Sequence, residues 1–198
     1  MKELLRDYMA RFTDLPLDRL EDILADIDVR HYPKGTHLLE PDQVPRYCYF
    51  VLKGCVREYK IDQSGLESTL EFYTEEDALA AMTTYDDIHP ADFYWTCVED
   101  CVLVVGDLNQ EEIMFDKHPG LERMVLKMVE DNFGRVQKRH AMLLTKSVEE
   151  RYIYLEDNRS DLFNRVPQHQ IASYLGVAPE SLSRIKKRIY KSKLKMIK

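Results

Sequence analysis

The side chains with the clearest capacity for chemistry lie between residues 166 and 187. Glu180 can accept a hydrogen bond from a cytosine amino group, and Arg184 can donate to the acceptor edge of guanine. The two residues are four positions apart, so a helix places them on one face, where Glu180 can also hold Arg184 in place. An ordinary surface ion pair is the alternative for these two. With phosphate contacts added, we predict a DNA-binding surface formed by Gln168, Glu180, Ser181, Arg184, Lys187 and Arg188.

Two helices joined by a tight turn are needed to position these side chains. Ala172 is small enough for the point where two helices cross, and Gly176 suits a left-handed backbone at the end of the first helix. Pro179 fits the first turn of the second helix. The apolar positions that join the helices are Ile171, Leu175, Val177, Leu182 and Ile185. This pattern predicts a helix-turn-helix whose second helix enters the major groove, with a helical hairpin in an ordinary core as the alternative.

The net charge of the chain hides a difference between its two ends. The 198 residues include 28 basic and 35 acidic ones, which gives a net charge of −7. Residues 161–198 contain nine basic and two acidic residues, so this segment is +7 and the other 160 residues are −14. Such a split predicts two modules with different partners, and the basic end is a candidate polyanion binder. A solvated lysine-rich terminus is the alternative, and the acidic total excludes a DNA coat that is basic throughout.

Upstream of the helix-turn-helix the pattern of apolar residues changes twice. Helical spacing is present over residues 3–12 and 17–27. From 29 to 105, runs rich in aromatic and β-branched residues alternate with turns about every 8–12 residues, which predicts a β-sandwich or jelly roll. The clearest runs are 47–52, 55–61, 69–73 and 102–105. After residue 106 the pattern is helical again over 107–117, and Ser147 with Glu150 has the form of a capping box that begins a later helix.

A helix of about 24 residues, roughly 36 Å long, is predicted over residues 121–144. One of its faces can pack on the β-roll, and a second apolar face needs another partner. We predict that this second face is the seam of a homodimer, and simple packing within the chain is the alternative. The residues of the seam are Val125, Val129, Phe133, Val136, His140 and Leu143.

Several classes of protein are disfavoured by what the sequence lacks. It has no nucleophile elbow, phosphate-binding loop or dinucleotide fingerprint, so we expect no catalytic residues and no enzyme. The histidines and the four cysteines have no metal-ligand spacing, so we expect no metal and buried structural cysteines. No apolar run approaches the roughly 20 residues that span a bilayer. The charged N-terminus does not resemble a signal peptide, which predicts a cytoplasmic protein without a membrane partner.

The whole chain resembles the Crp–Fnr family of bacterial transcription regulators. The resemblance is carried by Lys34 with Gly35, by residues 49–57, by the segment 147–152 and by residues 171–184, where Glu180 and Arg184 match the family's recognition helix. It implies a sensor β-roll, a long dimerisation helix and a C-terminal helix-turn-helix of winged-helix type. It also implies an effector held between the roll and the long helix, where the candidate pocket residues are Tyr73, Met82, Tyr85 and Trp95. The alternative is that these aromatic residues fill the core of the roll.

The sequence departs from the family pattern in three places, which bear on the expected operator, the expected effector and the wing. Pro179 stands where the family often has an arginine, so the operator is expected to differ from the best-known one. The region that matches the phosphate-binding cassette lacks the Gly-Glu and Arg-Ser pairs, and no arginine occurs between Arg57 and Arg123 to clamp a cyclic phosphate. We therefore expect no cofactor, and cyclic AMP or cyclic GMP least of all. The sequence after the recognition helix is a lysine-rich tail, so the wing is expected to be short or absent.

Together these observations predict an α+β protein with three parts: a β-roll sensor over 1–118, a dimerisation helix over 119–145 and a DNA-binding domain over 146–198. The predicted function is a homodimeric, sequence-specific transcription regulator that binds double-stranded DNA at an inverted repeat and responds to an unidentified effector. RNA polymerase is a further candidate partner. The alternative is a module for binding a small molecule or a protein, with a helix-turn-helix that no longer reads DNA.

Overall fold

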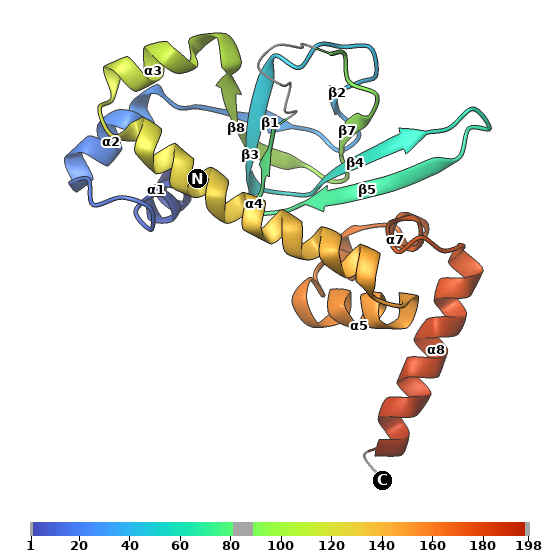
Figure 1. Cartoon of the computed structure of the whole chain (residues 1–198). Coiled ribbons are helices and arrows are strands. Elements are labelled where there is room, and N and C mark those ends of the chain that lie inside the picture. Colours follow the sequence, from blue (N-terminus) through green and yellow to red (C-terminus); the bar gives the residue numbers. More distant parts are fainter. Residues whose placement is uncertain (1, 81–88, 197–198) are drawn as a thin grey trace. The chain divides into compact units, whose positions relative to one another are not determined.

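The computed structural model describes residues 2–80 and 89–196, with side chains as far as residue 191. Eight strands form two four-stranded sheets with the orders β1-β8-β3-β6 and β2-β7-β4-β5 (Figure 1). The strands are β1 (Asp28–Tyr32), β2 (His37–Leu39), β3 (Tyr47–Lys53), β4 (Val56–Ile61), β5 (Glu67–Tyr73), β6 (Ala78–Leu79), β7 (Tyr94–Cys97) and β8 (Cys101–Asp107). In the first sheet β8 pairs antiparallel with both β1 and β3.

The helices precede and follow these strands along the chain. They are α1 (Lys2–Met9), α2 (Leu17–Asp26), α3 (Glu111–Lys117), α4 (Leu121–Thr145), α5 (Val148–Asn158), α6 (Leu162–Arg165), α7 (Gln168–Tyr174) and α8 (Pro179–Met196), with a short 3-10 helix at Leu108–Gln110. The capping box predicted at Ser147 is present, because its side chain and that of Glu150 each bond the other's backbone N–H. The predicted α+β architecture, with a β-roll, a long helix and C-terminal helices, is confirmed.

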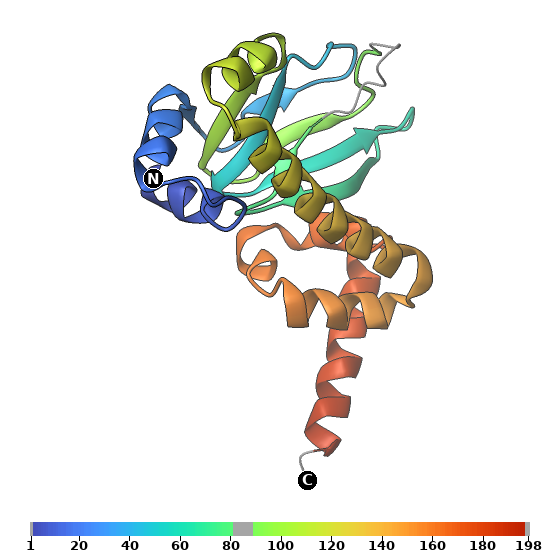
Figure 2. The ribbon, with the colours of Figure 1, turned by 60° about the vertical axis from the view of Figure 1, so that its left-hand side comes forward.

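Strands β3 and β8 are apolar on both faces because each face is covered. Tyr49 and Val51 of β3 point into the core between the two sheets, together with Leu103 of β8. The alternate residues, Leu52 and Val102, belong to a second core formed with the helices. Helices α1, α2 and the start of α4 supply the rest of that second core, and Figure 2 shows the two N-terminal helices beside the sheet.

The cysteines of the roll are mostly buried, as the sequence predicts. Cys55, Cys97 and Cys101 are buried, whereas Cys48 is half-buried. Cys97 ends β7 in one sheet and Cys101 begins β8 in the other, so their spacing is that of a turn between two strands and not of a helix. The hydrogen bond with Cys101, together with burial, raises the pKa of the Cys97 thiol. Because a thiolate is the reactive form of cysteine, these contacts favour a structural role for Cys97.

By its contacts the described chain divides into two compact units. The first contains residues 1–58 and 72–136, and the second contains residues 59–71 and 137–198. The second unit therefore combines the outer part of the β4–β5 hairpin with the end of α4 and the helices α5–α8. None of the described helices is long and apolar enough to cross a membrane.

Candidate nucleic-acid interface

Helices α7 and α8 form the predicted helix-turn-helix. The joining positions Ile171, Leu175 and Leu182 are each at most 1% exposed, and Ile185 is 9% exposed. Ala172 is completely buried, as expected for the crossing point of the two helices. Gly176 adopts a φ of +74°, and the N–H of Val177 donates to the carbonyl of Ala172 at 3.0 Å. This left-handed position ends α7 and turns the chain into α8.

The predicted DNA-binding residues lie at the start of α7 and along the first half of α8. Gln168, Glu180, Arg184, Lys187 and Arg188 are exposed and Ser181 is half-buried. Gln168 Nε2 donates to Ser183 Oγ at 3.2 Å, so the first turn of α7 lies against the exposed side of α8. The structure thus brings the start of α7 and the exposed face of α8 onto one surface.

Two predicted side chains have partners that the sequence did not indicate. Arg184 Nη2 donates to Ser181 Oγ at 3.2 Å, so among the described contacts Ser181 holds this guanidinium in place of Glu180. Arg188 forms an ion pair with Glu149 at the start of α5. Arg184 and Arg188 are nevertheless both exposed, and the Arg188 side chain is 66% exposed. An exposed ion pair of this kind is weak, so a phosphate can replace Glu149 at little cost.

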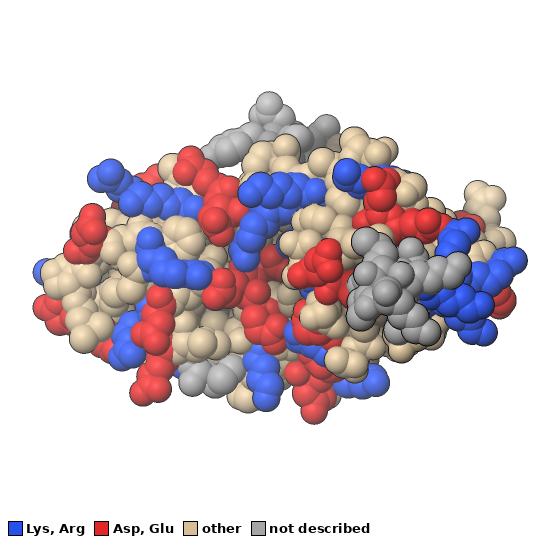
Figure 3. Space-filling model, turned by 90° about the horizontal axis from the view of Figure 1, so that it is seen from below, with Lys and Arg blue, Asp and Glu red and all other residues tan. Residues whose placement is uncertain are grey.

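Helix α8 continues well beyond the positions that would enter a groove. It runs to Met196, so residues 187–196 are helical and do not form a hairpin (Figure 2). At 1.5 Å per residue its 18 residues extend about 27 Å. Figure 3 shows Lys and Arg side chains gathered at one end of the viewed face, with acidic and basic side chains mixed over the rest. The basic surface is therefore local, as the charge split of the sequence predicts.

The predicted dimer seam on α4 is partly uncovered. Phe133 is 58% exposed and Val129 is 50% exposed, and His140 is also exposed. Val125, Val136 and Leu143 are half-buried. Leu126, which the sequence analysis did not include, is 57% exposed. Large apolar side chains on one helix are thus left in contact with solvent in the single chain.

Two of the four candidate effector residues donate to the same carboxylate. Tyr73 Oη and Trp95 Nε1 both bond Glu58 Oε2, at 2.8 and 2.9 Å. Trp95 is only 1% exposed and belongs to the core of the roll, although it also lines a cavity of about 210 Å³. Met82 and Tyr85 lie outside the described residues. For Tyr73 and Trp95 the contacts favour the alternative, a role in the core of the roll.

Side chains of α4 bind residues 76–78, at the beginning of the region 77–93 that the family resemblance matches to the phosphate-binding cassette. Residues 81–88 of that region lie outside the described residues. Ala78 N–H donates to Asn132 Oδ1 at 3.2 Å, and Asn132 Nδ2 donates to the Ala78 carbonyl at 3.4 Å. Arg135 Nη2 donates to the carbonyl of Glu76, and its guanidinium lies 4.0 Å from Asp77. Sequence reasoning missed Arg135, because the residue is about 60 positions away along the chain. The carboxylates of Asp77 and Asp131 compensate the positive charge of Arg135.

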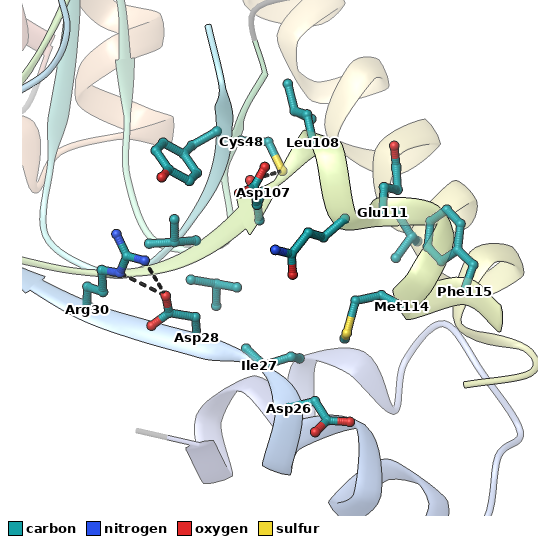
Figure 4. A pocket seen from close by; sticks show the side chains of 16 residues that line it. Asp26, Ile27, Asp28, Arg30, Cys48, Asp107, Leu108, Glu111, Met114 and Phe115 are labelled. Carbon is teal, nitrogen blue, oxygen red and sulfur yellow. Dashed lines mark hydrogen bonds and ion pairs between the residues drawn. The ribbon is translucent and has the colours of Figure 1, made fainter. Parts of the chain in front are cut away.

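A larger cavity of about 350 Å³ opens beside the first sheet (Figure 4). Its apolar wall includes Ile27, Met114 and Phe115, and its polar lining is mainly acidic. The acidic residues are Asp26, Asp28, Asp107 and Glu111, against one cationic lining residue, Arg30, which pairs with Asp28 at 2.6 Å. Hydrogen bonds from Lys117 and His118 lower the pKa of Asp26. Asp26, Asp28 and Asp107 are each paired with a basic side chain, so their charges are largely compensated. No sequence motif marks the cavity, because its residues come from several elements.

Comparisons with known proteins agree with this architecture. Residues 29–118 match the cyclic nucleotide-binding domain family. The chain is 23% identical over 195 residues to the fumarate and nitrate reduction regulatory protein of Vibrio cholerae, covering 92% of this chain and 76% of that protein.

Solved structures with the same fold include two proteins of similar length. FixK2 from Bradyrhizobium japonicum is 18% identical with a TM-score of 0.63, covering 84% of this chain and 85% of its own. CLP from Xanthomonas campestris, a global regulator responsive to c-di-GMP, is 17% identical with a TM-score of 0.68, covering 90% and 94%. Residues 29–118 thus match the cyclic nucleotide-binding domain family. Over most of its length the chain is similar to a regulatory protein, and it shares the fold of the two solved structures.

Proposed function

We propose that the protein is a homodimeric transcription regulator that binds a specific inverted repeat of double-stranded DNA through α8. The observation that carries this proposal is the helix-turn-helix itself, whose joining side chains are buried while Glu180 and Arg184 are exposed. The basic residues of α8 supply phosphate contacts, and the two polar side chains supply base contacts. An operator with half-sites about one turn, roughly 34 Å, apart suits such a dimer.

The dimer is supported by the uncovered apolar residues of α4. Leu126, Val129 and Phe133 are spaced by three and four positions, so they lie along one side of the helix. Two copies of this side can cover each other in a symmetric contact. The effector in this proposal is not a cyclic nucleotide, because no arginine between Arg57 and Arg123 is available to clamp a cyclic phosphate.

The test is selection of the purified protein against a random DNA pool, followed by binding measurements on the enriched site. We expect an inverted repeat whose affinity falls steeply with salt concentration, as phosphate contacts require. Arg184→Ala should cost about 1–3 kcal/mol on the enriched site and much less on random DNA, because a base contact is lost.

The matched control is Arg19→Ala, which removes the same charge from an exposed side chain of α2. It should leave both affinities unchanged. Equal losses on specific and random DNA for Arg184→Ala would contradict its role as a base contact. If no sequence is enriched, with or without added cell extract, the alternative module that does not read DNA is supported.

A further inference from the structure

A buried carboxylate connects the helix-turn-helix to the rest of its compact unit. Glu71, on β5, is 2% exposed and accepts hydrogen bonds from three side chains. The donors to its carboxylate oxygens are Arg139 Nε at 2.9 Å, Arg159 Nη1 at 3.1 Å and Tyr174 Oη at 3.2 Å. These donors lie on the last part of α4, at the end of α5 and in α7. Four elements of the second unit therefore meet at one carboxylate.

A second contact joins α7 to the same strand. Ser173 Oγ accepts from the N–H of Thr69 at 2.9 Å and donates to the carbonyl of Glu67 at 3.1 Å. A hydroxyl in this position bonds the strand as a neighbouring backbone would. Because Ser173 and Tyr174 are consecutive residues, both contacts restrict the same turn of α7.

These contacts differ from apolar packing because they are directional. A buried carboxylate is tolerated only when its partners are in place, so the positions of the two guanidinium groups and the tyrosine are mutually dependent. Burial and the neighbouring Glu71 charge raise the pKa of Tyr174, so its hydroxyl stays protonated as a donor. The arrangement consequently fixes the direction of α7 relative to the end of α4 and to α5.

The joining core of the helix-turn-helix transmits this direction to α8. Ala172 lies at the crossing with α8 and is completely buried, and it immediately precedes Ser173. A change in the position of α7 therefore moves α8 as well. In the contacts that the structure describes, the exposed side chains Glu180 and Arg184 of α8 do not bond Glu71. The cluster therefore acts apart from the side chains that would contact a base.

We propose that Glu71, Ser173 and Tyr174 are positioning residues that determine which half-site spacing the protein accepts. This proposal rests on the proposed DNA-binding function. In a dimer joined through α4, the direction of α8 relative to the end of α4, residues 137–145, affects the distance between the two recognition helices. The cluster holds that direction, and hence the spacing specificity, without contributing to the reading of a single half-site.

The test compares Ser173→Ala and Tyr174→Phe, singly and together, with wild type in the full chain. The control is Tyr152→Phe, because Tyr152 Oη also bonds a glutamate, Glu156, but within the single helix α5. Binding is measured on the selected repeat, on repeats lengthened or shortened by one base pair, and on an isolated half-site.

We expect the double variant to reduce the preference for the best spacing about fivefold or more, since it removes the hydrogen bonds of both side chains that fix α7. Its affinity for the half-site should stay within about twofold of wild type, as should every property of Tyr152→Phe. Ser173→Thr, which keeps the hydroxyl, should restore the preference lost in Ser173→Ala. An unchanged spacing profile in the double variant would overturn the proposal, and so would a parallel loss on the half-site.

A readout without DNA separates this proposal from the proposed function. Hydrogen exchange of the Thr69 amide should be faster in Ser173→Ala than in wild type and slow again in Ser173→Thr. If the wild type selects no DNA sequence, the proposed function fails and spacing specificity fails with it. The exchange rates then show whether α7 is docked on β5, and equal rates in all three proteins would refute the docking contact as well.

Discussion

At the scale of single residues, the turn of the helix-turn-helix depends on one glycine. Gly176 has a φ of +74°, and a Cβ added there would meet only Arg151 Nη1, at 3.6 Å. A side chain at position 176 would therefore have enough space, and it is the left-handed backbone that requires glycine there. Gly134, in α4, has no atom within 4 Å of an added Cβ and no positive φ. Gly176 is therefore needed for the backbone conformation of the turn. Gly134 has no such requirement, and it only adds the entropic disadvantage of a glycine inside a helix.

The same substitution should have opposite effects at these two glycines. Gly176→Ala should destabilise the protein by about 1–2 kcal/mol, because alanine disfavours the left-handed region. Gly134→Ala should stabilise it by about 0.5–1 kcal/mol, because alanine loses less backbone entropy in a helix. Urea unfolding followed by circular dichroism measures both changes. A neutral Gly176→Ala would contradict the turn geometry, and a destabilising Gly134→Ala would indicate close packing on that side of α4.

The sequence predicted which side chains of the helix-turn-helix are buried. It predicted the contacts of surface side chains less well. Ala172, Leu175 and Leu182 are buried as their types and spacing indicated. The partner of Arg184 was not predictable, because residues three and four positions away on a helix are both within reach of a long side chain. The four-residue spacing predicted Glu180 as the partner of Arg184, whereas Arg184 donates to Ser181.

At the scale of elements, apolar runs located the well-covered strands and missed the others. Strands β3 and β8 pack on two cores and are apolar except for Lys53 and Asp107 at their ends. Strand β1 has exposed and half-buried residues only, and β2 has three residues, so neither has a distinctive pattern. The residues Asn132 and Arg135 that bind the segment 76–78 also lacked a sequence signal, because they belong to an element far along the chain.

The lack of an arginine between Arg57 and Arg123 leads to a prediction about cyclic nucleotides as ligands. At 1 mM, a ligand with a Kd of about 10 μM would stabilise the protein by about 2.7 kcal/mol and raise the Tm by roughly 5–10 °C. We expect no such rise with cyclic AMP, cyclic GMP or cyclic di-GMP, measured by differential scanning fluorimetry. Linear AMP at the same concentration controls for general effects of anions. A rise specific to one cyclic nucleotide would refute the argument.

At the scale of the whole molecule, the helix-turn-helix was predictable but the unit that contains it was not. Residues 59–71 belong to the same compact unit as 137–198, although the two segments are far apart in sequence. Glu71 is separated by 68 positions from Arg139 and by 103 from Tyr174. A single sequence carries no periodicity that connects such distant positions, and only the folded chain shows that they meet.

The uncovered side of α4 leads to the prediction about assembly. Burying a phenylalanine side chain contributes about 1.5–3 kcal/mol, and a symmetric dimer buries each such residue twice. Phe133→Glu should therefore weaken dimerisation about a hundredfold or more, which sedimentation at micromolar concentration would show as a monomer. The matched control is Ile113→Glu, since Ile113 is 64% exposed on α3 and Phe133 is 58% exposed on α4.

The DNA affinities of the same variants separate loss of the dimer from loss of the recognition surface. A monomer still carries one complete α8, so Phe133→Glu should retain the half-site affinity of wild type while losing most of its affinity for the inverted repeat. Ile113→Glu should match wild type on both. If Phe133→Glu stays dimeric, or if the wild type is itself a monomer, the seam on α4 is wrong. The apolar residues Leu126, Val129 and Phe133 would then need another partner, because their exposure in the single chain is independent of the DNA-binding proposal.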